Sequence, residues 1–176
     1  MTLLKPKRFG DKRGFFAEIY NRRKFLEQGI SIEFVQDNHS ISHSVGTLRG
    51  LHFQAPPVPQ AKLVRCGRGA IFDVAVDIRR GSPTYGHWEG YELTAKNGHQ
   101  LYVPVGFAHG FVTLEPDSEI VYKCTDYYAP QTEGALHWDS CGIKWPLSID
   151  PILSDKDRVA VALTDFYSPF VYGKNS

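Results

Sequence analysis

The chain has 176 residues, a length that suits one well-buried core, so we expect a single domain over residues 1–176. Its 20 basic and 19 acidic residues leave a net charge of +1 without any long run of Lys or Arg, which argues against a nucleic-acid or membrane partner. The three cysteines are widely spaced and form no Cys-x-x-Cys pair, which argues against a disulfide framework and a zinc knuckle and indicates a reducing compartment.

The N-terminal segment, residues 1–14, mixes charges with glycine and lacks the apolar centre of a secretion signal. No stretch of the sequence approaches the length of a membrane span. We therefore expect a cytoplasmic protein. The first helix is predicted to begin after Asn21, a residue type suited to an N-cap, and to end before Gly29.

Short apolar runs separated by turn signals follow, and 16 Gly and 11 Pro are scattered among them. The clearest run covers residues 70–78, where Phe72, Val74, Val76 and Ile78 form one fully apolar face at a period of two. Further strands are predicted at residues 88–93, 100–103, 111–114 and 120–125. Strands at such even spacing are typical of a sandwich or barrel, so we predict an all-β fold with a few short helices.

The C-terminal part of the chain contains a second predicted helix. Ser154 is suited to its N-cap, and Asp157 stands three positions later as the acidic half of a capping box. The tail after Tyr167 is expected to be either a loose end or an arm that covers the barrel.

Two segments resemble the sequence motifs of the cupin family. Residues 98–109 fit the second motif in full: Gly, five residues, Pro, one residue, Gly, two residues and His. The first motif fits only in its frame, because a metal-binding cupin carries His-x-His and then Glu, whereas this chain has His52, Gln54 and Gln60. Amide oxygens are poor replacements for imidazole and carboxylate at a transition metal. The resemblance implies a cupin-type jelly-roll barrel that has no metal or other cofactor.

His52 and Lys62 are candidate catalytic residues on neighbouring predicted strands. Alternation places His52 on an inward face, where a lone histidine is more often a hydrogen-bonded core residue than a catalyst. Lys62 shares its face with Val64 and Cys66, and lysine is almost never buried without a partner or a task. The alternative is a surface strand in which Val64 faces solvent.

Three further residues have both a structural and a functional interpretation. Tyr122 alternates with inward apolar residues, yet tyrosines are common in cores. Asp157 on position alone is best explained as the capping acid. His109 is fixed by the motif that precedes it, and we expect a structural or substrate-contacting role. Arg13 and Arg49 are compatible with ordinary surface charges.

Several strings, in the same order and over residues 7–157, resemble the dTDP-4-dehydrorhamnose 3,5-epimerase family. They start at Gly10, Phe34, Leu48, Lys62, Asp73, Gly106 and Leu153, and read GDKRGFFAE, FVQDNHS, LRGLHFQ, KLV, DVAVDIR, GFAHGF and LSDKD. The family implies an epimerase that inverts C3 and C5 of dTDP-4-dehydro-6-deoxy-D-glucose, on the way to dTDP-L-rhamnose and cell-surface polysaccharide. Its substrate is a dTDP-linked 4-keto-6-deoxyhexose whose ketone acidifies the hydrogens on both neighbouring carbons.

The resemblance assigns a role to each catalytic candidate. It makes His52 the base and Asp157 the carboxylate that orients it, which suits an imidazole that titrates near neutral pH. It makes Tyr122 the acid on the opposite face of the sugar. It places Lys62 at the oxygen that becomes negative in the enolate, where a fixed charge in a dry site is effective.

The resemblance also implies substrate-binding residues. Arg49 and Lys156 would face the diphosphate, and Tyr128 would stack on the base. The full set is Arg13, Glu18, Gln36, Asn38, Arg49, His109, Tyr128 and Lys156. Family members are homodimers in which strands cross between subunits, so some of these contacts are expected from the partner chain.

Three alternatives remain open from the sequence. The first is a single-carbon epimerase or ketoisomerase on a related dTDP-keto sugar. The second is a non-catalytic cupin that binds a sugar nucleotide, which would have no need for Lys62 and Tyr122 together with an amide-substituted metal site. The third is a metal-dependent cupin oxygenase, which would need ligands that this chain lacks.

Overall fold

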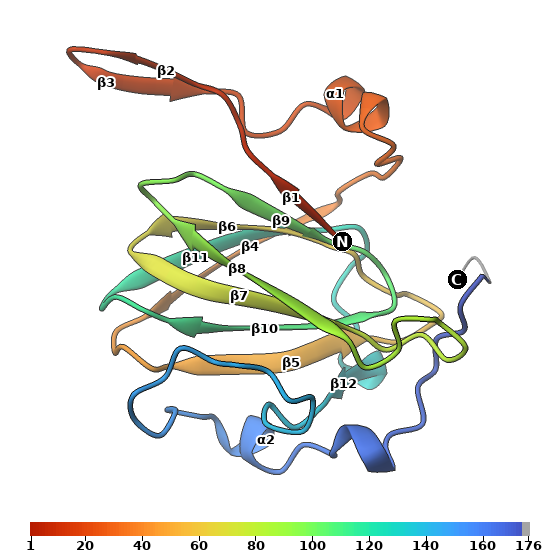
Figure 1. Cartoon of the computed structure of the whole chain (residues 1–176). Coiled ribbons are helices and arrows are strands. Elements are labelled where there is room, and N and C mark those ends of the chain that lie inside the picture. Colours follow the sequence, from red (N-terminus) through yellow and green to blue (C-terminus); the bar gives the residue numbers. More distant parts are fainter. Residues whose placement is uncertain (174–176) are drawn as a thin grey trace.

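Two antiparallel five-stranded sheets face each other in the computed structural model, which describes residues 1–173 (Figure 1). The elements are β1 (Thr2–Leu4), β2 (Arg8–Asp11), β3 (Gly14–Ala17), α1 (Arg22–Glu27), β4 (Gln36–Ser42), β5 (Leu48–Gln54), β6 (Lys62–Arg68), β7 (Ala70–Asp77), β8 (Trp88–Thr94), β9 (Gln100–Val103), β10 (Phe107–Thr113), β11 (Ser118–Cys124), a 3-10 turn η1 (Pro130–Thr132), β12 (Glu133–Ala135), α2 (Asp155–Arg158) and a second 3-10 turn η2 (Leu163–Asp165). The predicted all-β class is confirmed.

The strand order shows that neighbours in space are not neighbours in sequence. One sheet runs β1-β9-β6-β11-β4 and the other β12-β5-β10-β7-β8, so the chain passes repeatedly from one sheet to the other. This exchange between two facing antiparallel sheets is the arrangement of a jelly roll. It brings residues of β5 and β10 opposite residues of β6 and β11, although these strands are far apart in the chain.

The space between the sheets is filled from both sides. Val64 and Ile120 of the first sheet pack with Ile71, Ala75 and Phe111 of the second, and all are at most 5% exposed. Lys62 is the first residue of β6 and lies on the same face as Val64, as the alternation predicts. A barrel wall lined in this way leaves a polar site only where polar side chains replace the apolar ones.

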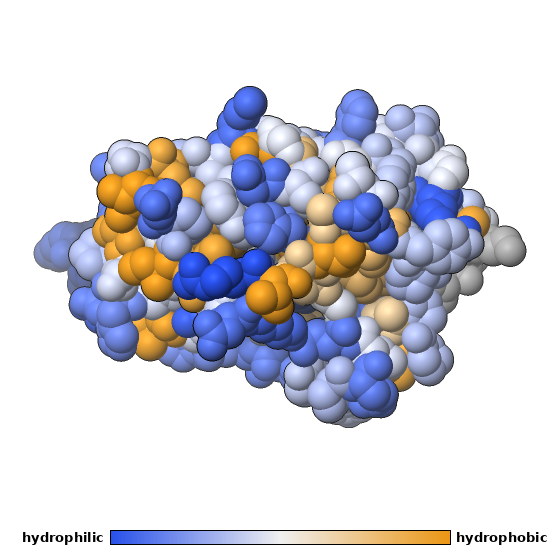
Figure 2. All heavy atoms as spheres, turned by 90° about the horizontal axis from the view of Figure 1, so that it is seen from below, coloured by the Kyte–Doolittle hydropathy of each residue, from blue (hydrophilic) through white to orange (hydrophobic). Residues whose placement is uncertain are grey.

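Both faces of β7 are buried, and the alternation did not predict that the face of Ile71 and Ala75 is the one that fills the barrel. Val74, Val76 and Ile78 pack outside the barrel against the C-terminal segment, including Phe166 and Phe170. In Figure 1 the segment before the tail runs beneath β5, and the tail after Tyr167 rises at the right of the view. Phe170 in this tail is 3% exposed and Val171 forms a bridge with Arg80, so the described part of the tail covers the barrel. Seen from below, the surface of the molecule carries both hydrophilic and hydrophobic residues, and the hydrophobic ones form separate patches (Figure 2).

Both predicted helices are present, and each begins directly after the residue predicted as its N-cap. The side-chain oxygen of Asn21 accepts from the backbone N–H groups of Arg23 and Lys24, and Gly29 lies beyond the end of α1 with a positive φ of 77° that suits glycine. Ser154 caps α2 by accepting from the backbone N–H of Asp157. No helix in residues 1–173 is long and apolar enough to cross a membrane.

The N-terminal hairpin of β2 and β3 was not predicted, because its residues are mostly charged or exposed and show no buried face. It projects away from the two sheets (Figure 1). Phe15 and Phe16 on β3 are 59% and 70% exposed. The strand predicted at residues 111–114 is also longer than expected, since β10 begins at Phe107.

Candidate active site

His52 and Asp157 form a hydrogen-bonded pair at the edge of the barrel. The Nε2 atom of His52 on β5 lies 2.5 Å from Oδ1 of Asp157 on α2. The second oxygen, Oδ2, accepts from the Ser154 hydroxyl at 2.8 Å, so the residue that caps the helix also holds the carboxylate. Burial opposes ionisation of Asp157, but the hydrogen bonds from His52 and Ser154 outweigh it and lower the pKa of this carboxyl. Asp157 is therefore a fixed anion behind the imidazole.

Lys62 and Tyr122 lie on the facing sheet. Lys62 on β6 pairs with Cys124 on β11, two positions along from Tyr122, and its Nζ is 5.9 Å from the centre of the tyrosine ring. Burial lowers the pKa of Lys62, and Cys124, Asp73 and Glu133 oppose this. Burial also raises the pKa of Tyr122. The phenol thus keeps its proton to a higher pH than a free tyrosine does.

One cavity of about 430 Å³ lies between these two walls and is lined by seven of the predicted catalytic and substrate-binding residues. They are His52, Lys62, Tyr122, Asp157, Arg49, His109 and Lys156. The Arg49 guanidinium donates to the Ser42 hydroxyl at 3.2 Å, which holds this cation beside the cavity. The cavity therefore joins His52 and Asp157, a pair suited to proton removal, with Arg49 and Lys156, two cations suited to an anionic ligand.

His109 lies opposite His52 in the pairing of β10 with β5, and its Nε2 is 2.8 Å from Oδ1 of Asp73 on β7. Asp73 is fully buried, and its second oxygen has no hydrogen-bond partner in the part of the chain that the structure describes. An unpaired buried carboxylate oxygen is costly, so a nearby cation is its natural compensation. Lys62 is the cation whose ionisation Asp73 favours.

A second cavity of about 360 Å³ adjoins the first and shares His52, Lys62 and Tyr122 with it. Gln36 and Tyr128 line it, and the Tyr128 backbone N–H donates to Oε1 of Gln36 at 2.9 Å. Asn38, directly opposite Tyr122 in the ladder, lines it too. Three more predicted residues are thus collected beside the reactive groups.

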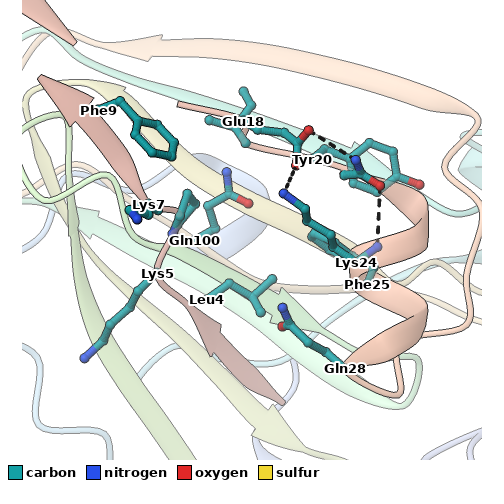
Figure 3. A pocket seen from close by; sticks show the side chains of 13 residues that line it. Leu4, Lys5, Lys7, Phe9, Glu18, Tyr20, Lys24, Phe25, Gln28 and Gln100 are labelled. Carbon is teal, nitrogen blue, oxygen red and sulfur yellow. Dashed lines mark hydrogen bonds and ion pairs between the residues drawn. The ribbon is translucent and has the colours of Figure 1, made fainter. Parts of the chain in front are cut away.

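Arg13 and Glu18 lie elsewhere in the same chain. Arg13 is at the turn of the projecting hairpin, where it pairs with Asp11 at 2.6 Å. Glu18 lines a separate pocket at the base of the hairpin, and its carboxylate pairs with Lys24 at 2.7 Å (Figure 3). Neither side chain lines the cavities around His52.

The chemistry of the main cavity follows from its two walls. A histidine with an orienting carboxylate on one sheet and a tyrosine on the other can remove a proton from one face of a bound molecule and deliver one to the opposite face. A lysine beside the tyrosine can stabilise negative charge that develops between them. Together these groups can invert the configuration of a carbon next to a carbonyl.

Comparison with known proteins agrees with this geometry. The family model described as dTDP-4-dehydrorhamnose 3,5-epimerase matches residues 1–165. The chain belongs to this family. The family's enzyme from Salmonella typhimurium is 54% identical over 93% of this chain and 90% of its own length.

Solved structures of the family superimpose closely. The epimerase from Legionella pneumophila in complex with dTDP-4-keto-L-rhamnose has a TM-score of 0.90 and 46% identity, over 94% of this chain and 88% of that one. A 3'-monoepimerase from Streptomyces bikiniensis in complex with dTDP-quinovose has a TM-score of 0.85 and 37% identity, over 92% and 83% of the two chains. The cupin-like jelly roll expected from the sequence motifs is therefore confirmed.

Gln54 and Gln60 stand where metal-binding cupins carry ligands. In this chain their side-chain amides bind the backbone of neighbouring loops. Nε2 of Gln54 donates to the backbone oxygens of Val58 and Tyr127, at 2.5 and 2.9 Å. Nε2 of Gln60 donates to the oxygen of Asp126 at 2.7 Å. Among the described residues, no group of three or more His, Cys, Asp or Glu is placed to hold a metal ion.

Two residues of the site were missed in the sequence. Asp73 carried a signal, because an acid interrupts an otherwise apolar run of β7. Glu133, which lines the second cavity, carried none, because β12 has only three residues in a stretch without periodicity.

Proposed function

We propose that this protein inverts C3 and C5 of dTDP-4-dehydro-6-deoxy-D-glucose and so forms dTDP-4-dehydro-L-rhamnose. The observation that carries the proposal is the placement of His52 and Tyr122 on opposite walls of one cavity, with Lys62 beside the tyrosine. The substrate is inferred from membership of the family. About half of the residues are identical to those of the Salmonella typhimurium enzyme.

In the proposed reaction, His52 removes the proton from the carbon next to the ketone. The electron pair moves into the carbonyl and gives an enolate, whose oxygen is stabilised by the Lys62 ammonium. Tyr122 then donates its proton to the opposite face of the same carbon, and the ketone reforms. Asp157 stabilises the imidazolium that exists between these two steps. The second carbon is inverted by the same groups after proton exchange with solvent.

We further propose that the dTDP part binds between two copies of the chain in a cytoplasmic homodimer. The projecting hairpin with exposed Phe15 and Phe16 has an apolar surface suited to a second subunit, and Arg13 and Glu18 lie on or beside it. These two residues would then reach the partner's site. Light scattering is expected to give twice the chain mass for the wild type and a lower mass for Phe16→Ser.

Proton NMR of dTDP-4-dehydro-6-deoxy-D-glucose with the protein in D₂O tests the proposed reaction. We expect deuterium to enter C3 and C5 and the signals of the L-rhamnose product to appear. Exchange without inversion, or no exchange, would contradict the proposal.

A single-carbon epimerase is the second candidate, since a 3'-monoepimerase has the same fold. Its lower identity, 37% against 54% for the Salmonella enzyme, favours inversion of both carbons. Deuterium at one carbon only would decide for the single-carbon reaction.

A further inference from the structure

Glu133 uses both of its carboxylate oxygens to join two segments of the site. Oε1 forms an ion pair with Nζ of Lys156 on α2. Oε2 accepts a hydrogen bond at 3.1 Å from the hydroxyl of Tyr128, in the loop before β12. Burial opposes ionisation, but Lys156 and Tyr128 outweigh it and lower the pKa of Glu133. The carboxylate is thus an anion with defined partners on both sides.

Its position links both cavities. Glu133 begins β12, which pairs with β5 so that Ala135 lies opposite His52. Glu133 lines the cavity of Gln36 and Tyr128, whereas Lys156 lines the cavity of His52 and Asp157. The ion pair therefore spans from the strand next to the histidine to the helix that carries its carboxylate partner.

The short helix α2 needs such support. It has four residues, too few to be stable by helix formation alone. Of these, Asp157 alone is buried, and Val159 directly after the helix is 81% exposed. Within the described residues, the Asp157 carboxylate binds His52 and the backbone N–H of Gly50, both on β5, and Lys156 pairs with Glu133 on β12. These side-chain contacts tie α2 to the strands of the barrel.

We propose that Glu133 is a positioning residue: through Lys156 it holds α2 so that Asp157 stays in register with His52. The proposal rests on the proposed function, in which Asp157 orients the catalytic base. Lys156 need not leave Glu133 to bind a diphosphate, because an ammonium group has three donors. Glu133 then also aims the lysine into the cavity.

The kinetic test compares Glu133→Gln with Lys156→Gln. A small misplacement of a catalytic group costs up to about 10²-fold in rate. Glu133→Gln, which keeps the size of the side chain, should lower kcat by roughly 10- to 100-fold with little change in KM. Lys156→Gln should lower kcat similarly and also raise KM, because the phosphate contact is lost.

The matched control is Glu119→Gln. Glu119 also pairs with an exposed cation, Arg68, and its side chain is 30% exposed against 27% for Glu133, but it lies outside the two cavities. It should leave kcat and KM unchanged. A Glu133→Gln variant with the kcat of the control would overturn the proposal, and so would one in which KM rises while kcat stays.

Hydrogen exchange of the free protein supplies a readout that needs no substrate. The Asp157 amide, which donates to Ser154, should exchange faster in both Glu133→Gln and Lys156→Gln than in the wild type or the control. Unchanged exchange would overturn the proposal even if kcat fell, because Glu133 would then act on the substrate directly. A wild type that does not turn over the keto sugar would refute the proposed function, whereas faster exchange in the two variants would still support the positioning role.

Discussion

Asp157 lies 2.5 Å from His52 although 105 positions separate them in the chain. The carboxylate side chain is 3% exposed, and both of its oxygens are engaged, one by His52 and the other by Ser154. Since Ser154 is also the helix N-cap, the local structure that starts α2 is the same structure that aims the carboxylate. The imidazole is thereby held by one nitrogen, and among residues 1–173 no hydrogen bond engages the other, which leaves it available to a bound molecule.

Replacing Asp157 by Asn should lower kcat by about 10²- to 10⁴-fold, because the neutral amide neither orients the ring correctly nor stabilises its protonated form. The measurement is the initial rate on the keto sugar, monitored by NMR. Asp155→Asn is the control, since Asp155 lies on the same helix turn but is exposed. Equal rates for the two variants would argue against a catalytic role of the His52–Asp157 pair.

Replacing Tyr122 by Phe should separate proton removal from inversion. His52 can still take the proton and return a solvent-derived one to the same face, so deuterium enters the substrate while the L-rhamnose product fails to form. The NMR experiment in D₂O follows both events in one sample. Loss of deuterium exchange together with inversion would show that the phenol is needed before the enolate forms.

Sequence patterns predicted the elements whose signals are local. Asn21 and Ser154 cap their helices as expected, because a cap depends on a few adjacent residues. The strand at residues 100–103 is confirmed to the residue. By contrast, the hairpin of β2 and β3 has no buried face that would give its sequence a period.

Most residues of the site could be predicted from the sequence, whereas the contacts between them could not. Asp157 on position alone was a capping acid. In the structure its amide donates to the Ser154 hydroxyl, and its carboxylate accepts from that hydroxyl and binds His52. No periodicity connects β5 with a helix so far along the chain, and the resemblance to a family supplied that link. Glu133 could not be found, because its partners Lys156 and Tyr128 are brought to it only by the folded chain.

Replacing Lys62 by Met should lower turnover strongly with little change in stability. Burial of the ammonium costs free energy that an apolar side chain of similar length does not, but Asp73 loses a nearby cation. Because these two effects oppose each other, the melting temperature should change little. The rate should fall by about 10²- to 10³-fold, the usual loss when one group that stabilises developing charge is removed. Calorimetry and initial rates measure the two effects.

The control for Lys62 is Lys123→Met on β11, next to the site but outside its main cavity. Lys123 forms a surface ion pair with Asp37 at 2.8 Å, so its removal should change stability by at most about 1 kcal/mol and leave turnover intact. A Lys62→Met protein that keeps its rate would remove the lysine from the mechanism.

Replacing Asp77 by Asn should destabilise the fold without touching the chemistry. Asp77 is 1% exposed and accepts hydrogen bonds from Arg79, from Ser82 at 2.6 Å and from Thr84 at 2.7 Å. Breaking a buried, charged network of this kind costs roughly 3 kcal/mol in the free energy of unfolding. Asp37→Asn, which removes an exposed partner of Lys123, should cost at most about 1 kcal/mol.

The same comparison carries a pH dependence. Burial opposes ionisation of Asp77, but its hydrogen bonds from Arg79, Ser82 and Thr84 outweigh it and hold the pKa well below the usual range. A depressed folded-state pKa stabilises the protein above the unfolded pKa of about 3.9, and this stabilisation is lost as the pH falls through the folded-state pKa. In urea titrations the gap between wild type and Asp77→Asn should therefore be constant between pH 8 and pH 5 and shrink below about pH 4. A gap that stays constant down to pH 2.5 would mean that lost packing, rather than lost charge, accounts for the difference.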